Sequence, residues 1–114
     1  MHKTLLPDGW PRPKGYANGV VAHGDSIIFC GGQIGWTNDE QFEHHDFVGQ
    51  VRQALENVVA VLASAGAGPE HIARMTWYVT NREQYLEDLG AVGRVYRDII
   101  GKHFPAMSVV EVSA

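Results

Sequence analysis

Two segments of the chain repeat apolar residues at every third or fourth position, and each is followed by a segment typical of a β-strand. The repeats cover residues 48–62 and 85–99, where they would give a helix one apolar face. The segments that follow are IARMTWYVT, in which two kinds of side chain alternate, and the short apolar run MSVVEV. This pattern predicts two helices that cover a sheet, because amphipathic helices and half-buried strands bury their apolar faces against each other.

Local signals indicate where these two helices begin and end. Asp46 stands before the first repeat, where it can act as the N-cap of a helix. The sequence AGAGP follows the repeat, and its glycines and proline would end the helix. Asn81, with Gln84 three positions later, resembles a capping box at the start of the second repeat. We therefore expect one helix between Asp46 and AGAGP, and a second between Asn81 and Gly101.

The N-terminal part predicts an irregular arm followed by a hairpin. Residues 1–15 hold three of the five prolines and are expected to lack regular structure. Residues 20–23 and 26–30 are short β-branched runs separated by Gly24-Asp25, a dipeptide typical of a tight turn. The predicted element order is therefore β-β-α-β-α-β, an α+β fold.

The predicted order also constrains how the layers pack. Strand–helix–strand crossovers are almost always right-handed, which places both helices on one face of the sheet. A chain of 114 residues is long enough for a single core, so we expect one domain over residues 1–114. Its second sheet face has no cover, and an uncovered apolar face usually becomes a subunit interface.

Composition excludes several classes of protein. No apolar run approaches the roughly 18 residues that a membrane-spanning helix requires, and the N-terminus lacks the apolar core of a signal peptide. We therefore expect a cytoplasmic protein with no membrane partner. The formal net charge of −4 disfavours nucleic acid as a partner, because it gives no general attraction to phosphate.

Few residues have the spacing of a catalytic, metal or cofactor site. The segment EHHD, residues 43–46, is expected to bind no metal, because adjacent histidines point apart. The segment CGGQIG matches neither a Walker loop nor a dinucleotide fingerprint, so no cofactor is expected. The single cysteine, Cys30, is expected to be a buried apolar residue. Trp77 is expected in the core, with a pocket wall as the alternative.

Three segments in order resemble the Rid family, also called RidA/YjgF and endoribonuclease L-PSP-like: KGYANGVVAHGDSIIFCGGQIG, QVRQALENVVAVLASAGAGPEHIARMTWYVTN and VYRDIIGKHFPAMSVVEV. The resemblance implies a chorismate-mutase-like α+β domain, three copies of which form a barrel-like homotrimer with clefts between subunits. It also implies a small-molecule substrate. In the best-known branch, these clefts hydrolyse enamines and imines such as 2-aminoacrylate to a ketoacid and ammonia.

The resemblance implies two groups of site residues that this chain retains. Tyr16 matches the tyrosine of the family's G-P-Y motif and is the expected catalytic residue. The backbone of Gly31 and Gly32, before the GQI segment, would bind the substrate, although the family has a serine where Gly31 stands. The family also places a glutamate on a further strand, and we expect that strand to be missing after Ala114.

At three other positions the chain departs from the family, and these complete the predicted substrate-binding set. Met107 stands in PAMS, where the deaminase branch has the arginine of P-A-R-S that anchors the substrate carboxylate. Gly93 stands where the family has an asparagine, and Val109 where it has a cysteine. These changes predict a cleft that is less polar and accepts a neutral or aromatic ligand. Arg12, Lys14 and Arg94 are the nearest cations, and we expect them to face solvent.

Three functions are compatible with this reading. The first is a hydrolytic deaminase that acts on a less acidic or more apolar enamine or imine than 2-aminoacrylate, with Met107 as an apolar wall. The second is a catalytically silent trimer that binds a small molecule. The third, a ribonuclease, is disfavoured by the acidic charge and by the lack of a basic stripe.

Overall fold

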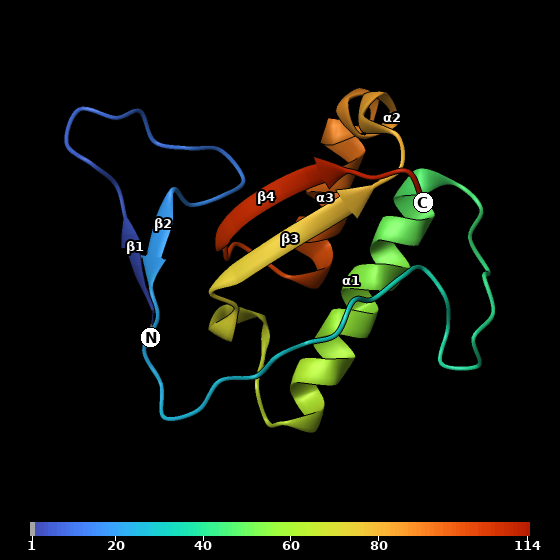
Figure 1. Cartoon of the computed structure of the whole chain (residues 1–114), viewed down its shortest axis with the longest axis horizontal. Helices are drawn as coiled ribbons and strands as arrows, with labels where there is room; N and C mark the ends of the chain where they lie inside the picture. Colours follow the sequence, from blue (N-terminus) through green and yellow to red (C-terminus); the bar gives the residue numbers. More distant parts are fainter. Residues whose placement is uncertain (1) are drawn as a thin grey trace.

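A computed structural model describes residues 2–114, which form three α-helices and two separate two-stranded sheets (Figure 1). The elements in order are β1 (Lys3–Leu5), β2 (Gly19–Val21), α1 (Phe47–Ser64), the 3₁₀ turn η1 (Pro69–His71), β3 (Arg74–Val79), α2 (Arg82–Glu87), α3 (Leu89–Ile99) and β4 (Ala106–Glu111). None of the helices in this described part is long and apolar enough to cross a membrane.

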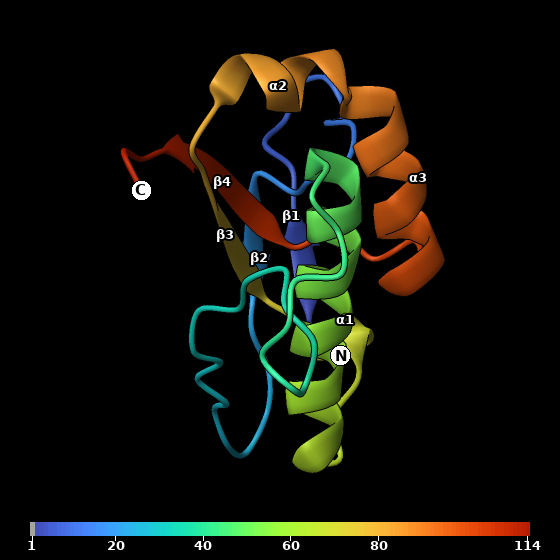
Figure 2. The same ribbon diagram turned by 90° about the vertical axis from the view of Figure 1, so that its right-hand side faces the viewer.

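Strands β3 and β4 are parallel neighbours, as the two strand–helix–strand units predict. Their register pairs Met75 with Met107 and Trp77 with Val109. Because side chains alternate between faces along a strand, these four residues share one face of the pair. Helices α1 and α3 both lie on one side of the pair (Figure 2), and Met75, Trp77 and Met107 pack against the cluster these helices form. The mixed α+β architecture is confirmed.

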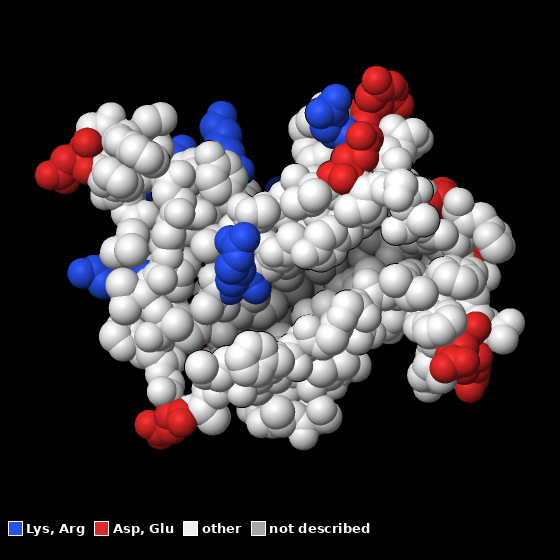
Figure 3. All heavy atoms as spheres, in the orientation of Figure 1, with Lys and Arg blue, Asp and Glu red and all other residues white. Residues whose placement is uncertain are grey.

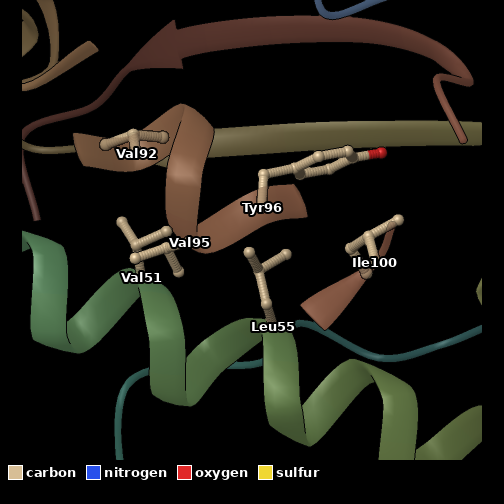
Figure 4. Close-up of a cluster of buried hydrophobic side chains, with 6 residues drawn as sticks. All are labelled: Val51, Leu55, Val92, Val95, Tyr96 and Ile100. Atoms are coloured by element: carbon tan, nitrogen blue, oxygen red, sulfur yellow. The ribbon is translucent and has the colours of Figure 1, made fainter. Parts of the chain in front are cut away.

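The core is the seam between α1 and α3. It consists of buried side chains that interdigitate between the two helices (Figure 4): Val51, Leu55, Val92, Val95, Tyr96 and Ile100. Most of these positions belong to the apolar repeats in the sequence, so the three-to-four spacing identified the correct helix faces. Burying this seam gives the helices most of their stability, because isolated helices of this length are marginal in water.

Replacing Leu55 by alanine is expected to lower the free energy of unfolding by roughly 2–4 kcal/mol. Leu55 is only 6% exposed and lies in the centre of the seam, so truncation leaves a cavity between α1 and α3. Urea denaturation followed by circular dichroism measures the change. Glu56→Ala on the exposed side of the same helix is the control, and a loss as small as the control's would contradict this packing.

The N-cap bonds of Asp46 and Asn81 form as predicted, but the Gln84 side chain donates to Asp88 instead of completing a capping box with Asn81. The Asp46 carboxylate accepts a hydrogen bond from the backbone N–H of Gly49 at 3.1 Å, at the start of α1. The Asn81 side chain accepts one from the backbone N–H of Gln84 at 3.0 Å, at the start of α2. The prediction of one continuous second helix is wrong. Asp88, with φ −99° and ψ 14°, separates α2 from α3.

The predicted hairpin does not form. Residues 19–21 pair antiparallel with residues 3–5, so β1 provides the partner that the second run was expected to provide. The N-terminal arm is therefore not wholly irregular. Residues 26–30 are not a strand, and Ile27 and Phe29 are 79% and 89% exposed. Nothing in the described chain covers this run, so an apolar strand there would bury neither face. Cys30 is exposed rather than buried.

Candidate functional site

A cavity of about 390 Å³ opens where the segment before β2 passes β4 and α3. Its size lies within the range of small-molecule sites. Four of the six predicted site residues line it: Tyr16, Gly93, Met107 and Val109. They come from an N-terminal loop, a helix and a strand that are far apart in the sequence. The fold therefore brings these four together around one space.

Gly31 and Gly32 do not join the other four. They lie in the exposed segment between β2 and α1, and neither lines the cavity. A Cβ atom built on either glycine would meet no atom within 4 Å. Within one chain, their backbone N–H groups are therefore not part of this site.

A short backbone contact holds Tyr16 beside β4. The next residue, Ala17, is 3% exposed and forms a parallel bridge with Ala106 at the start of β4. Its N–H donates to the carbonyl of Pro105 at 2.9 Å, and Pro105 is fully buried. Tyr16 and Met107 are the chain neighbours of the two bridged residues, so the bridge holds both of them at the wall of the same cavity.

Aromatic side chains form the inner wall of the cavity. Trp77 and Tyr85 meet edge to face with ring centroids 6.1 Å apart, and Tyr96 stacks on Phe104 at 5.7 Å. Trp77 also packs against the core cluster, so it serves as both core and pocket wall. This wall is suited to a flat apolar group, since aromatic rings prefer offset stacking and edge contacts.

The buried phenols of the wall are hydrogen-bond donors rather than bases. Burial raises the pKa of Tyr96 far above its ordinary value, and it also raises the pKa of Tyr85. Both therefore stay protonated at neutral pH. The Tyr96 hydroxyl donates to the carbonyl oxygen of His103 at 2.6 Å, which ties α3 to the loop before β4. Tyr96 thus shapes the cavity, and Tyr16, 44% exposed, is the most exposed phenol of its lining.

Arg97 is a cavity residue that the sequence reasoning missed. It lies on α3 four positions after Gly93, and a Cβ atom built on Gly93 would stand 3.4 Å from Arg97 Nη1. Residues four apart share a helix face, so this spacing was the available signal. The three cations named from the sequence, Arg12, Lys14 and Arg94, are all exposed, as expected. Lys14 lines this cavity, whereas Arg12 and Arg94 do not.

The EHHD segment and the other acidic, histidine and cysteine residues give no metal centre. Among residues 2–114, no group of three or more such side chains is placed to hold an ion.

Comparison with known proteins agrees with this architecture. Residues 11–114 match the family described as endoribonuclease L-PSP. A 2-iminobutanoate/2-iminopropanoate deaminase from Salmonella typhimurium is 32% identical, over 99% of this chain and 87% of that protein. A Rid family protein of unknown function, YyfB from Yersinia pestis, superposes with a TM-score of 0.85 at 24% identity, over 99% of this chain and 86% of its own.

A second solved structure supports the same assignment at higher sequence identity. YyfA from Yersinia pestis, also a Rid family protein of unknown function, is 31% identical with a TM-score of 0.66, and the match covers 100% of this chain and 88% of that one. The family match spans nearly the whole chain and includes every residue that lines the cavity. The chain therefore belongs to the Rid (RidA/YjgF) family, the family described as endoribonuclease L-PSP.

Proposed function

We propose that this protein hydrolyses an enamine or imine to a carbonyl compound and ammonia at the cavity beside Tyr16. The observation that carries the proposal is the convergence of Tyr16, Gly93, Met107 and Val109 on one cavity. A relative of known activity, 32% identical over 99% of the chain, is a 2-iminobutanoate/2-iminopropanoate deaminase, which supports the same reaction class.

The reaction needs little chemistry from the protein. An enamine first becomes the imine by moving a proton from nitrogen to its β-carbon. Water then adds to the carbon of the C=N bond, and the tetrahedral product loses ammonia as a proton moves from oxygen to nitrogen. A positioned hydroxyl speeds such steps by holding the water and relaying the proton. Tyr16 is 44% exposed and lies at the cavity, so its hydroxyl is the group that serves this role.

The lining favours a substrate more apolar than 2-aminoacrylate. Met107 and Val109 donate no side-chain hydrogen bonds, and Gly93 has no side chain. The remaining wall is mainly aromatic. A small amino acid derivative would leave most of this wall uncovered, whereas a larger apolar group would displace water from it.

A panel of imines tests the proposal. An amino-acid oxidase generates the imine in situ, and semicarbazide traps the imine that has not been hydrolysed. We expect the protein to reduce trapping of the imine of phenylalanine more than that of alanine. No effect on any imine of the panel, with correctly folded protein, would refute the proposed activity.

The second candidate is a silent binding protein. The replacement of polar family residues at Gly93, Met107 and Val109 favours it. Saturable binding of a carbonyl product, with no acceleration of ammonia release from any imine, would select this alternative. A ribonuclease has less support, because the net charge of −4 gives the chain no general attraction to a phosphate backbone.

We expect a homotrimer in solution. Large apolar side chains are unusually exposed in the single chain, including Ile27, Phe29 and Tyr78 at 79%, 89% and 69%. Tyr78 lies on the face of β3 opposite α1 and α3, the face predicted to lack a cover. Light scattering should give three times the chain mass of 12.6 kDa. A monomer mass at micromolar concentration would contradict the expectation.

A further inference from the structure

Basic side chains are concentrated around the cavity. Lys14 and Arg97 line it, and no aspartate or glutamate does. A second cavity of about 610 Å³ adjoins the first, shares Lys14 and Tyr16 with it, and adds Arg12 and Lys102, again without an acidic residue. Together the two cavities contain four of the nine lysines and arginines and none of the thirteen acidic residues.

This separation of charge is notable because the chain as a whole is acidic. Figure 3 shows the face of the β3–β4 pair that points away from α1 and α3, and there too the acidic side chains lie toward the edges of the molecule. A recess lined by one sign of charge attracts ligands of the opposite sign more strongly than the net charge suggests. The lining of this recess therefore favours an anionic ligand over a neutral or cationic one.

We propose that Arg97 is the anion-binding residue of the cavity and that, with Lys14, it holds the carboxylate of an aromatic 2-imino or 2-oxo acid. The proposal concerns the same cavity as the proposed function and names its ligand class. The family's arginine position is occupied by Met107 on β4, so the positive charge is supplied from α3 instead.

The guanidinium of Arg97 is available for this role. The ion pairs of residues 2–114 are Arg52–Asp98 and Glu70–His71, and Arg97 belongs to neither. Its neighbour Asp98 is bound to Arg52 on α1 at 3.1 Å, so that carboxylate does not neutralise Arg97. Gly93 leaves the arginine side chain room on the helix surface. An arginine in this position can receive a carboxylate with two parallel hydrogen bonds.

The aromatic wall specifies the other end of the ligand. Trp77, Tyr85 and Phe104 offer ring surface to an aromatic group. The indole Nε1–H of Trp77 is buried and has no acceptor among the described residues. Because this nitrogen is closed to solvent, the wall offers a ligand the faces and edges of its rings rather than this hydrogen bond. A ring with an attached carboxylate matches both the wall and the cations.

Binding of three probes tests the proposal. Phenylpyruvate carries ring and carboxylate, its methyl ester carries the ring without charge, and pyruvate carries the carboxylate without ring. Titration calorimetry on the full chain should show phenylpyruvate binding more tightly than either of the others. Arg97→Met should weaken phenylpyruvate binding on the order of tenfold and leave binding of the ester unchanged.

Matched variants separate charge from packing. Arg94→Met removes the same side chain from the same helix but outside both cavities, and it should leave all three affinities unchanged. Arg97→Lys should recover part of the affinity for phenylpyruvate. Equal effects of Arg97→Met and Arg94→Met, or a lysine variant as weak as the methionine variant, would overturn the proposal. So would wild-type protein that does not bind phenylpyruvate at millimolar concentration.

The binding test is independent of turnover, because phenylpyruvate and its ester contain no C=N bond to hydrolyse. Arg97-dependent binding without imine hydrolysis would refute the deaminase and uphold the anion site. Imine hydrolysis by a protein whose binding of phenylpyruvate does not depend on Arg97 would uphold the deaminase and refute the anion site.

Discussion

The wild-type protein is expected to hydrolyse 2-aminoacrylate more slowly than an arginine-bearing relative by a factor on the order of 10²–10⁴, and Met107→Arg is expected to recover part of this loss. Met107 lies on β4 and lines the cavity next to the residues that hold Tyr16. Its thioether donates no hydrogen bond to a carboxylate. Two charge-assisted bonds of roughly 1.5–3 kcal/mol each are therefore missing.

Arg97 does not remove this expectation. It belongs to α3 rather than β4, so it holds a carboxylate at a different place in the cavity. A small substrate also lacks the ring that would bind the aromatic wall and fix its orientation. Misplacing a reacting group by about 1 Å can cost on the order of 10² in rate. We therefore expect bulky aromatic imines to be better substrates than 2-aminoacrylate for the same chain.

A coupled assay measures this prediction. An enzyme releases 2-aminoacrylate, which inactivates a reporter transaminase, and the protein under test protects the reporter according to its rate. Met107→Leu keeps the apolar volume without new donors and should protect no better than wild type. Urea midpoints should confirm that both variants fold. Protection by wild type equal to that of an arginine-bearing relative would contradict the expectation.

The helical half of the fold was predictable because its signals are local. Asp46 and Asn81 cap helices through bonds to residues three positions away, and the apolar repeats identified the seam around Leu55. The break at Asp88 was missed because α2 and α3 carry one continuous apolar pattern. A periodic sequence does not distinguish a continuous helix from two that meet at an angle.

The N-terminal half depends on partners that are distant in the sequence. Val20 and Val21 have the composition of a strand, but their choice of residues 3–5 as partner is decided by the tertiary fold. The run 26–30, which contains Ile27 and Phe29, has as high a β-propensity as the segments that form strands. It nevertheless remains unpaired and exposed in a single chain. A strand there requires a neighbour and a covered face, which another subunit would provide in the proposed trimer.

The candidate site was predictable in part for a similar reason. Tyr16, Gly93, Met107 and Val109 were located by their resemblance to family motifs, and the fold brings all four to one cavity. Gly31 and Gly32 came from the same resemblance but lie in the unpaired segment, away from that cavity. Arg97 lies within the family-like segment VYRDIIGKHFPAMSVVEV, but the resemblance assigns it no role, so only its spacing from Gly93 connected it with the site.

Replacing Tyr16 by phenylalanine is expected to lower the turnover of the imine of phenylalanine by a factor on the order of 10². The change removes one hydroxyl and leaves the ring, so the aromatic lining and the Ala17–Ala106 bridge remain. Burial raises the pKa of both Tyr85 and Tyr96, which makes each hydroxyl a poorer proton donor than an ordinary phenol. The Tyr96 hydroxyl is also bound to the carbonyl of His103.

The loss should appear in turnover rather than in binding. The calorimetric affinity for phenylpyruvate should stay within about twofold of wild type, because the carboxylate and ring contacts do not involve the Tyr16 hydroxyl. Tyr78→Phe removes the same group outside the cavity, on the face expected to be the subunit interface. If light scattering shows that this variant keeps the wild-type mass, its turnover should be unchanged. Full turnover by Tyr16→Phe would exclude the tyrosine from the proton transfer. The water would then be activated by a group outside the single chain, such as one that a neighbouring subunit contributes to the cleft.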